Sequence, residues 1–342
     1  MPRVSIIIVS WNALNHLKTF LPSVWNHSHS LAEIIIADND SSDDSNAWVR
    51  AHFPEVRIAE LDQNYGYCGG NNRAALQANG EYLLFLNNDV EVSSGWLEPL
   101  IRMMDEHPDV GAIQPKIRSV EQPASFEYAG AAGGLLDRHG YPYCLGRIFD
   151  HVEEDKGQYD TVRPISWASG AAIMTRKTLF SELGGFDESF VFHMEEIDYC
   201  WRLRQRDYKI MNCPSSVVYH LGGGSLPSDS PRKRYYNFRN NLKMLFKNLP
   251  RKKLFTILPV RLLLDMIATF QTILRLEWRM AFEMIRARWH FYASIPDLIA
   301  YRKSLSINNI EPSPYVLRPY SILWHYFIKK KKTFGDLPES GF

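Results

Sequence analysis

The chain has 342 residues, of which 45% are hydrophobic, so it can form one large globular domain with an appendage, or two domains. Its formal charge of +1 conceals an uneven distribution: residues 231–342 hold 21 Lys/Arg and 7 Asp/Glu, whereas residues 1–230 hold 18 and 31. This division suggests two tasks. The acidic part could hold metal and substrate, and the basic part could meet the phosphates of lipid head groups or of nucleic acid.

The cysteines and the first residues indicate a compartment. Cys68, Cys144, Cys200 and Cys213 are dispersed, and no pair has the CxxC spacing of a zinc site. The first twelve residues contain an apolar run of only six, too short for a signal peptide or a membrane span. We therefore expect a reduced, cytoplasmic protein, peripheral on the inner face of the cell membrane if the basic part binds lipid.

Strand and helix patterns alternate over the first hundred residues. Strand-like apolar runs occupy residues 4–9, 32–37, 55–61 and 81–86, with helical patterns between them. Such alternation predicts an α/β fold with a Rossmann-like, mostly parallel central sheet flanked by helices. Ligands of these sheets bind outside the carboxyl ends of the strands, where this chain carries the polar sequences SWN, DNDSSDD, DQNYG and NND.

After residue 118 the regular alternation of strand and helix patterns ends. Residues 119–163 are irregular by sequence, residues 167–177 predict a strand entering a helix, and residues 194–207 predict a helix. Two short strands, 208–213 and 216–220, precede a loop at 221–231 that is flexible by composition. Beyond Pro231 the sequence is basic, aromatic and helical, so we place a domain boundary at 228/229.

Segment 254–276 raises a membrane question. It is largely apolar, but Pro259, Arg261 and Asp265 interrupt it, and charges at the centre of a span are costly. We favour helices that lie on a membrane surface, flanked by RKK at 251–253 and KKKK at 329–332. The alternative is an amphipathic helix packed on the preceding domain.

Asp89 is the candidate metal ligand. The common phosphate-binding motifs GxxxxGK[ST] and GxGxxG are absent, so a divalent cation is the obvious partner for a bound phosphate. Mg²⁺ typically takes one or two protein carboxylates while substrate phosphates supply other ligands, so one acid after a buried strand is enough. The alternative is an Asp that caps a turn.

Two further elements could carry chemistry. On the helix at 194–207, Asp198 and Arg202 are four residues apart and predict a structural pair, whereas an unpaired acid near the helix start could act as a general base. The simpler explanation is that these acids favour the helix dipole. His220 ends a strand before a glycine loop suited to closure over a substrate, although a lone His is more often structural.

Taken together and in this order, the motifs resemble those of the inverting nucleotide-sugar glycosyltransferases of family two, with the GT-A fold, and in particular their rhamnosyltransferase-like branch. The resemblance covers roughly residues 3–225. The segments that carry it are VSIIIVSWN, IIIADNDSSDDS, NYGYCGGNN, LLFLNNDV in the DxD position, WASGAAIMTRK, GGFDESFVFHMEEIDYCWRLR and YHLGGGS.

The resemblance implies roles for particular residues. Asp38 and Asp40 would hold the base and ribose of the donor nucleotide, Asp89 would bind the cation that bridges its pyrophosphate, and His220 would complete the metal or phosphate contacts. Glu196 would be the general base toward the acceptor hydroxyl. The remaining predictions for the donor site are Ser10, Asn12, Asn64, Gly66, Gly70 and Asn88. Those for the acceptor site are Trp167, Ser169, Gly170, Glu195 and Asp198. Taken alone, Trp167 is more often a core residue than one that stacks on a sugar.

The resemblance also implies partners and domains. Residues 1–228 would form the catalytic domain, with a nucleotide-sugar half at about 1–118 and an acceptor half at about 119–228, and residues 229–342 a basic helical extension. The cofactor would be Mg²⁺ or Mn²⁺. The donor would be a dTDP- or UDP-linked sugar, with rhamnose favoured, and the acceptor a glycan or lipid-linked glycan of cell-surface polysaccharide synthesis. An anionic membrane surface could also bind, and no nucleic acid is expected.

Two departures from the family pattern bear on these roles. The first acid of the DxD motif is replaced by Asn87, and the usual Glu-Asp pair is Glu195-Glu196. Two other classes compete with this reading. A metal-dependent nucleotidyltransferase would have a Gly-rich basic loop after the first strand, which is absent. A non-catalytic nucleic-acid-binding protein could use the basic tail but would leave the acidic strand ends unexplained.

Overall fold

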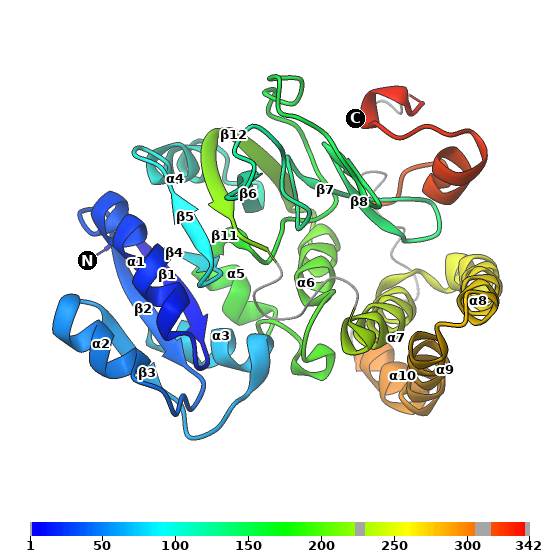
Figure 1. Ribbon diagram of the computed structural model, residues 1–342, viewed down its shortest axis with the longest axis horizontal. Helices are drawn as coiled ribbons and strands as arrows, with labels where there is room; N and C mark the ends of the chain where they lie inside the picture. Colours follow the sequence, from blue (N-terminus) through cyan, green and yellow to red (C-terminus); the bar gives the residue numbers. More distant parts are fainter. Residues whose placement is uncertain (1, 223–229, 305–315, 339–342) are drawn as a thin grey trace.

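A computed structural model describes residues 2–222, 230–304 and 316–338. At its centre lies an eight-stranded sheet in the order β3-β2-β1-β4-β11-β6-β12-β5, with helices on both faces (Figure 1). Its strands are β1 (Val4–Ser10), β2 (Ala32–Asp38), β3 (Arg57–Glu60), β4 (Tyr82–Leu86), β5 (Val90–Val92), β6 (Val110–Ser119), β11 (Ala172–Arg176) and β12 (Lys209–His220).

The sheet is mostly parallel, as predicted. β1 pairs in parallel with β2 from Val4 opposite Ala32 to Ser10 opposite Asp38, and it also pairs in parallel with β4. β11 and β5 run antiparallel to their neighbours. The carboxyl ends of β1, β2 and β4 therefore lie along one edge of the sheet, where the sequence places its polar residues.

Burial on both faces explains the continuous apolar run of β1. Ile6 and Ile8 enter the core that includes Leu17 of the following helix, whereas Ile7 enters the core on the other face with Ala74. A strand covered on both sides needs apolar residues at successive positions rather than an alternating pattern.

The helices of the first 220 residues are those that the sequence predicts, with an additional one after β5. They are α1 (Leu14–Ser28), α2 (Ser45–His52), α3 (Gly66–Gln77), α4 (Leu97–Glu106), α5 (Lys177–Glu182) and α6 (Glu195–Arg204). A 3-10 turn, η1 (Glu188–Phe190), precedes α6.

Two local predictions need correction. Residues 119–163 are not wholly irregular, because they form an antiparallel four-stranded sheet of β7 (Gly134–Leu136), β8 (Pro142–Cys144), β9 (Arg147–Ile148) and β10 (His151–Val152). The two strands predicted at 208–220 are the single strand β12, whose pairing with β6 shifts register between Cys213 and Val217. Most of the predicted loop at 221–231, and with it the boundary at 228/229, lies outside the described residues.

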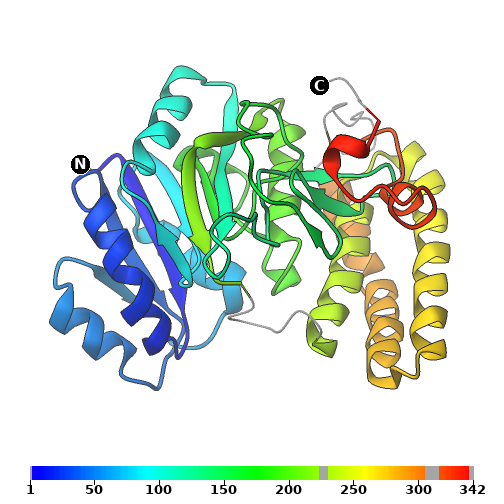
Figure 2. The same cartoon turned by 45° about the horizontal axis from the view of Figure 1, so that its top comes forward.

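The C-terminal residues form helices on the side of α6 and of the small antiparallel sheet (Figure 1 and Figure 2). These are α7 (Pro231–Asn248), α8 (Arg251–Leu274), α9 (Trp278–Ala293) and α10 (Ile295–Ser304), followed by η3 (Trp324–Ile328) and η4 (Phe334–Asp336). By length and composition, α8 is the one helix in the described ranges that could cross a membrane.

Candidate active site

Asp89 lies in the turn between β4 and β5, next to the end of β12. Its Oδ1 is 3.1 Å from Nε2 of His220, whose Nδ1 is 3.0 Å from Oε2 of Glu127. All three side chains are buried. The backbone also joins the two strand ends, since the amide of Leu221 donates to the carbonyl of Asp89 at 3.0 Å.

His220, which lies between the two carboxylates, is protonated and positively charged at neutral pH. Burial alone would lower the pKa of His220, but the hydrogen bonds to Asp89 and Glu127 outweigh it and raise the pKa to about 10. Burial likewise opposes ionisation of Asp89, yet the contact with His220 keeps its pKa below the usual value. Asp89 is therefore an ionised carboxylate in a buried position.

This arrangement fits a cation that arrives with phosphates. In the described part of the chain, no three His, Cys, Asp or Glu side chains converge as a ready metal site. Only one carboxylate oxygen of Asp89 contacts His220, which leaves the other for a cation. His220 lies between the two carboxylates, with Nε2 beside Asp89 and Nδ1 near Glu127, so in this state it pairs with Asp89 rather than offering a lone pair to a metal.

The carboxyl ends of β1 and β2 hold polar groups that lack partners. Ser10 and Asp38 are paired in register, both are buried, and neither the Oγ of Ser10 nor the Oδ1 of Asp38 has a hydrogen-bond partner. Buried polar atoms without partners are costly and require an explanation. A polar ligand at this strand edge, such as a nucleoside, would satisfy both.

A hydrogen bond joins the two loops that follow β1 and β2 at this edge of the sheet. Asn12 accepts a hydrogen bond from the amide of Ser42 at 2.8 Å, which joins the loops after β1 and β2. Asp40 is exposed and adopts a left-handed conformation with φ of 62°. The sequence predictions for Ser10, Asn12, Asp38 and Asp40 thus fall at one place in the fold.

The glycine segment that begins α3 packs against the same edge. Asn39 donates to the carbonyl of Gly66 at 3.0 Å, and Asn64 accepts from the amide of Gly66 at 2.9 Å. Gly66 has φ of 69°, which favours glycine. A Cβ on Gly70 would lie 3.0 Å from the Asn39 amide nitrogen, so this glycine permits the close approach.

Two adjacent carboxyl groups begin α6 in different surroundings. Glu195 is buried, and burial together with the neighbouring Glu196 raises its pKa well above the usual value. Glu196 is only partly buried, and burial raises its pKa to about 7. Each has one buried Oε2 without a hydrogen-bond partner. Both groups are thus weaker acids than an ordinary Glu, and Glu196, with a pKa near 7, can take up a proton at neutral pH.

Helix α7 holds the segment that leads into these acids. The amide nitrogen of the buried Asn240 lies 2.9, 2.7 and 2.8 Å from the carbonyl oxygens of Phe190, Phe192 and His193. His193 and Met194 have positive φ, which side chains other than glycine rarely adopt. Asn240 therefore stabilises an unfavourable backbone immediately before Glu195.

Two of the predicted acceptor residues have structural roles instead. Asp198 is completely buried and contacts Arg202 Nε and Lys247 Nζ, each at 2.8 Å, and Asn248 Nδ2 at 2.7 Å. Neither of its oxygens remains for an acceptor. Trp167 is buried and its Nε1 donates to the Leu135 carbonyl at 2.9 Å, so it belongs to the core and cannot stack on a sugar.

The other residues of the WASGA segment form a connection rather than an open surface. Ser169 is buried, with its amide donating to Gln114 and its hydroxyl to the carbonyl of Ala129. Gly170 is partly buried and its carbonyl accepts from the hydroxyl of Tyr67 at 2.7 Å. This bond joins the acceptor half to the glycine segment.

The sequence reasoning missed three residues. Glu127 stands in a stretch without a motif, Asn39 lies between two predicted residues, and Asn240 follows the segment that resembles the family. Asn88, which was predicted, is partly buried and lies 3.4 Å from Nδ1 of His16. A polar residue between two candidate ligands is a usable signal for Asn39, but no sequence signal marks Glu127 or Asn240.

The polar strand ends of this mostly parallel sheet suit a nucleotide, and the carboxylate of Asp89 suits a cation that accompanies its phosphates. The chain belongs to the Glycosyl transferase family 2, whose profile matches residues 5–183. It is therefore a glycosyltransferase that uses a nucleotide sugar.

Similar proteins of known function synthesise glycans. The N-acetylglucosaminyl-diphospho-decaprenol L-rhamnosyltransferase of Mycobacterium tuberculosis is 24% identical over 229 residues, which cover 63% of this chain and 75% of that protein. The low-salt glycan biosynthesis hexosyltransferase Agl10 of Haloferax volcanii is 26% identical over 246 residues, covering 69% and 73%.

Solved structures share the fold. The S. aureus TarS fragment 1–349 in complex with UDP-GlcNAc matches with a TM-score of 0.58 at 17% identity, covering 88% of this chain and 84% of that one. GalNAc-T7 with UDP, GalNAc and Mn²⁺ matches with a TM-score of 0.58 at 16% identity, covering 96% of this chain but only 56% of that one. These likenesses confirm the GT-A architecture.

Proposed function

We propose that the protein is a metal-dependent, inverting transferase that moves a sugar from a nucleoside-diphosphate donor to a hydroxyl of a glycan or lipid-linked acceptor in cell-surface polysaccharide synthesis. The observation that carries the proposal is the pair at the start of α6. Of two neighbouring carboxyl groups, only Glu196 has a pKa near neutrality and a partly exposed position. A general base works best when its pKa lies near the operating pH.

In the proposed reaction, Glu196 takes the proton of the acceptor hydroxyl as that oxygen attacks the anomeric carbon. The new carbon–oxygen bond forms while the bond from the anomeric carbon to the donor phosphate breaks, and the nucleoside diphosphate leaves. Attack from the face opposite the leaving group inverts the anomeric centre. Glu195 is buried, so it is less accessible than Glu196 to the acceptor hydroxyl.

Asp89 would hold the cation, Mg²⁺ or Mn²⁺, with His220 and Glu127 fixing the orientation of its carboxylate. A cation there stabilises the negative charge that develops on the departing diphosphate. Ser10 and Asp38, with their unpaired buried oxygens, would bind the nucleoside. Mn²⁺ is present in the structures of GalNAc-T7 and of the mannosyltransferase PcManGT, which share the fold, and this supports the choice of cation.

For the donor we propose a dTDP- or UDP-linked sugar, with rhamnose favoured. The rhamnosyltransferase relative supports rhamnose and a lipid-linked acceptor, since its name specifies a decaprenol-linked substrate. The UDP-GlcNAc complex of TarS supports a second candidate, transfer of N-acetylglucosamine from UDP.

A thermal-shift panel of nucleotide sugars with Mn²⁺ tests the donor. A tight ligand raises the melting temperature by mass action. We expect the largest rise with dTDP-rhamnose. A larger rise with UDP-N-acetylglucosamine would favour the second candidate, and no rise with any nucleoside-diphosphate sugar would contradict the proposed function.

A further inference from the structure

Helix α8 reverses the pattern usual in a water-soluble protein, because its polar residues are buried and its apolar residues are exposed. Its buried residues are mainly polar and include Arg261, Asp265, Thr269 and Thr272. The Arg261 Nε lies 3.1 Å from Asp265 Oδ1, and its guanidinium lies 3.3 Å from the ring centre of Tyr141. The charged groups that interrupt the apolar segment therefore pack against the small antiparallel sheet, where Tyr141 lies just before β8.

The opposite side of α8 is apolar and faces solvent. Leu263, Met266, Ile267, Phe270 and Leu274 recur at the spacing of one helical face, and each is 47–66% exposed. The most apolar window of α8 has a mean hydropathy of 1.6, but only 22% of it is buried. An apolar stripe of this length is unfavourable in water unless something covers it.

Helix α9 continues the exposed apolar surface. It follows α8 after three residues and packs on it, with the Arg288 guanidinium donating to the Thr269 hydroxyl at 2.8 Å. Its exposed apolar side chains also lie on one helical face: Trp278, Phe282, Ile285, Trp289 and Tyr292. We call these five residues and the five of α8 the α8–α9 apolar face.

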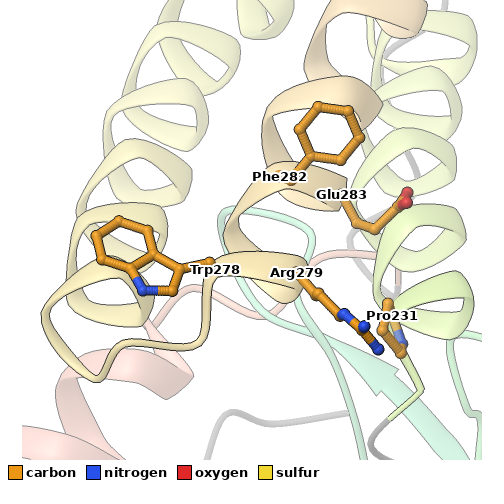
Figure 3. A pocket seen from close by; sticks show the side chains of 5 residues that line it. All are labelled: Pro231, Trp278, Arg279, Phe282 and Glu283. Carbon is orange, nitrogen blue, oxygen red and sulfur yellow. The ribbon is translucent and has the colours of Figure 1, made fainter.

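At the beginning of α9, the apolar face borders a cavity and two of its aromatic rings are exposed. A cavity of about 330 Å³ there is lined by Pro231, Trp278, Arg279, Phe282 and Glu283. In Figure 3 the Arg279 side chain is directed toward Pro231 at the start of α7, while the rings of Trp278 and Phe282 project away from that contact. Both rings are about 60% exposed.

Positive charge borders the apolar face. Residues 251–304 contain 10 Lys/Arg and 4 Asp/Glu. Arg251, Lys252 and Lys253 are exposed at one end of α8, and Arg275 is exposed at the other. A second exposed basic run, Lys329–Lys332, directly follows the exposed Trp324, Phe327 and Ile328. Apolar and aromatic side chains edged by Lys and Arg match the interface of an anionic bilayer.

We infer that the α8–α9 apolar face docks on the surface of an anionic lipid bilayer, with α8 lying along the interface rather than crossing it. The buried pair of Arg261 and Asp265 supports the statement that α8 does not cross the bilayer. A spanning α8 would have to remove both charges from their contacts with the protein and place them in hydrocarbon, which is costly. Docking at the interface leaves these contacts intact and covers only the residues that are already exposed.

Vesicle flotation of the full chain tests the inference. We expect binding to preformed vesicles of phosphatidylcholine mixed with phosphatidylglycerol, and much weaker binding to phosphatidylcholine alone. Ile267→Gln with Phe270→Gln removes apolar groups from the face and is expected to reduce the apparent partition coefficient at least about tenfold. Lys252→Gln with Lys253→Gln should reduce mainly the preference for the anionic vesicles.

The matched control is Leu76→Gln with Val162→Gln, two exposed apolar residues elsewhere on the molecule, which should bind vesicles as the unmodified chain does. All variants should keep the melting temperature of the parent, since their changed side chains are exposed. Acyl-chain-brominated lipid should quench tryptophan fluorescence of the parent and less so of the Ile267/Phe270 variant.

Three results would overturn the inference. One is undiminished vesicle binding by the Ile267/Phe270 variant. Another is a dimer of the parent in sedimentation velocity that this variant dissociates, with no vesicle binding by either, which would assign the face to a second copy of the chain. The last is failure of the parent to bind preformed vesicles when its recovery requires detergent, which would indicate a spanning α8. None of these measurements depends on glycosyl transfer.

Discussion

Glu195 and Glu196 are neighbours in sequence, yet the structure gives them different chemistry. Burial and the adjacent carboxyl raise the pKa of Glu195 well above the usual value, whereas burial raises the pKa of Glu196 to about 7. The two groups interact, and a pair of coupled carboxyls separates its proton affinities in this way. The proton acceptor at neutral pH is thus determined by the surroundings of each side chain rather than by its identity.

The pH dependence of transfer follows from this difference. The base must be ionised to act, so kcat/KM is expected to be low below pH 7, to rise through about pH 7 and to level off above it. Glu196→Gln should lower kcat by about 100- to 10,000-fold and abolish this rise. Initial rates from pH 5 to 9 measure both effects.

Glu195→Gln is the matched control. It replaces the carboxyl with an amide of the same size and leaves unchanged the burial that raises the pKa of Glu196, so we expect substantial activity and an apparent pKa that stays near 7. Full activity of Glu196→Gln together with loss in Glu195→Gln would contradict the assignment of the base.

The account makes a separate prediction for Asp89. Asp89→Asn preserves size but removes the charge, and we expect a decrease in kcat of at least about 100-fold. Titration calorimetry should show that Mn²⁺ no longer strengthens donor binding. Glu121→Gln, an exposed carboxylate in the loop after β6, should behave as the parent. Unchanged activity of the parent in EDTA would refute the metal role.

At the residue scale, the sequence locates strand-end groups better than it identifies side-chain contacts. Asp89 was predicted because a buried strand leads directly into it, and its position is confirmed. Glu127 was missed because it reaches His220 through the fold, 93 positions away in the chain, without any periodic pattern. Trp167 and Asp198 fell in segments that resemble the family, but tertiary packing uses both internally.

At the scale of elements, α7 packs against the segment that leads into α6 and Glu196. Besides Asn240, Lys243 donates to the Ser189 carbonyl at 3.1 Å, and Lys247 contacts Asp187 and Asp198, each at 2.8 Å. These contacts cover the segment from η1 to the first turns of α6. The helix that follows the predicted boundary therefore completes the environment of the proposed base.

Asn240→Ala tests this dependence. It leaves carbonyl groups before α6 without their donor, so we expect a loss of about 1–3 kcal/mol in the free energy of unfolding. Because the segment held by Asn240 leads directly into α6 and Glu196, kcat should fall and the apparent pKa of the pH–rate profile should shift. Denaturant melts and pH profiles measure these effects together.

Asn212→Ala provides a comparison for this variant. Asn212 is also buried and donates to carbonyl groups, but in β12 rather than at the loop. It should cost similar stability and leave the apparent pKa in place. Equal shifts in both variants would mean that Asn240 has no special connection to the base.

Element prediction from sequence succeeded where periodicity extends over many residues and failed where it does not. The apolar runs of β1, β2 and β4 are long enough to identify. The strands of the small sheet have two or three residues each, too few for an alternating pattern to appear. The bulge in β12 interrupted its pattern, so one strand was predicted as two.

At the scale of the whole molecule, part of the positive charge of the C-terminal region is used inside the protein. Lys247 is buried against Asp187 and Asp198, so some positive charge of the C-terminal region neutralises acids of the catalytic region rather than an external phosphate. The remaining exposed basic residues gather around the α8–α9 apolar face and at Lys329–Lys332.

A chain ending at residue 230 should therefore not fold stably. Its Asp198 would keep Arg202 but lose Lys247 and Asn248, and the core would lose the buried Met244, Leu245 and Leu249. Loss of several buried apolar side chains from a core is strongly destabilising. We expect rapid limited proteolysis and no cooperative thermal transition. A cooperative transition at the melting temperature of the full chain would show instead that residues 1–230 are an independent domain.

The central claim is metal-dependent glycosyl transfer with Glu196 as the base, and one assay tests it most directly. Release of nucleoside diphosphate is measured over a panel of nucleotide sugars with a polyprenyl-linked glycan acceptor, in Mn²⁺ and in EDTA, for the parent and Glu196→Gln. The account predicts release from one donor, only in Mn²⁺ and only by the parent, with a product of inverted anomeric configuration. Release that persists in EDTA, or equal release by Glu196→Gln, would contradict it.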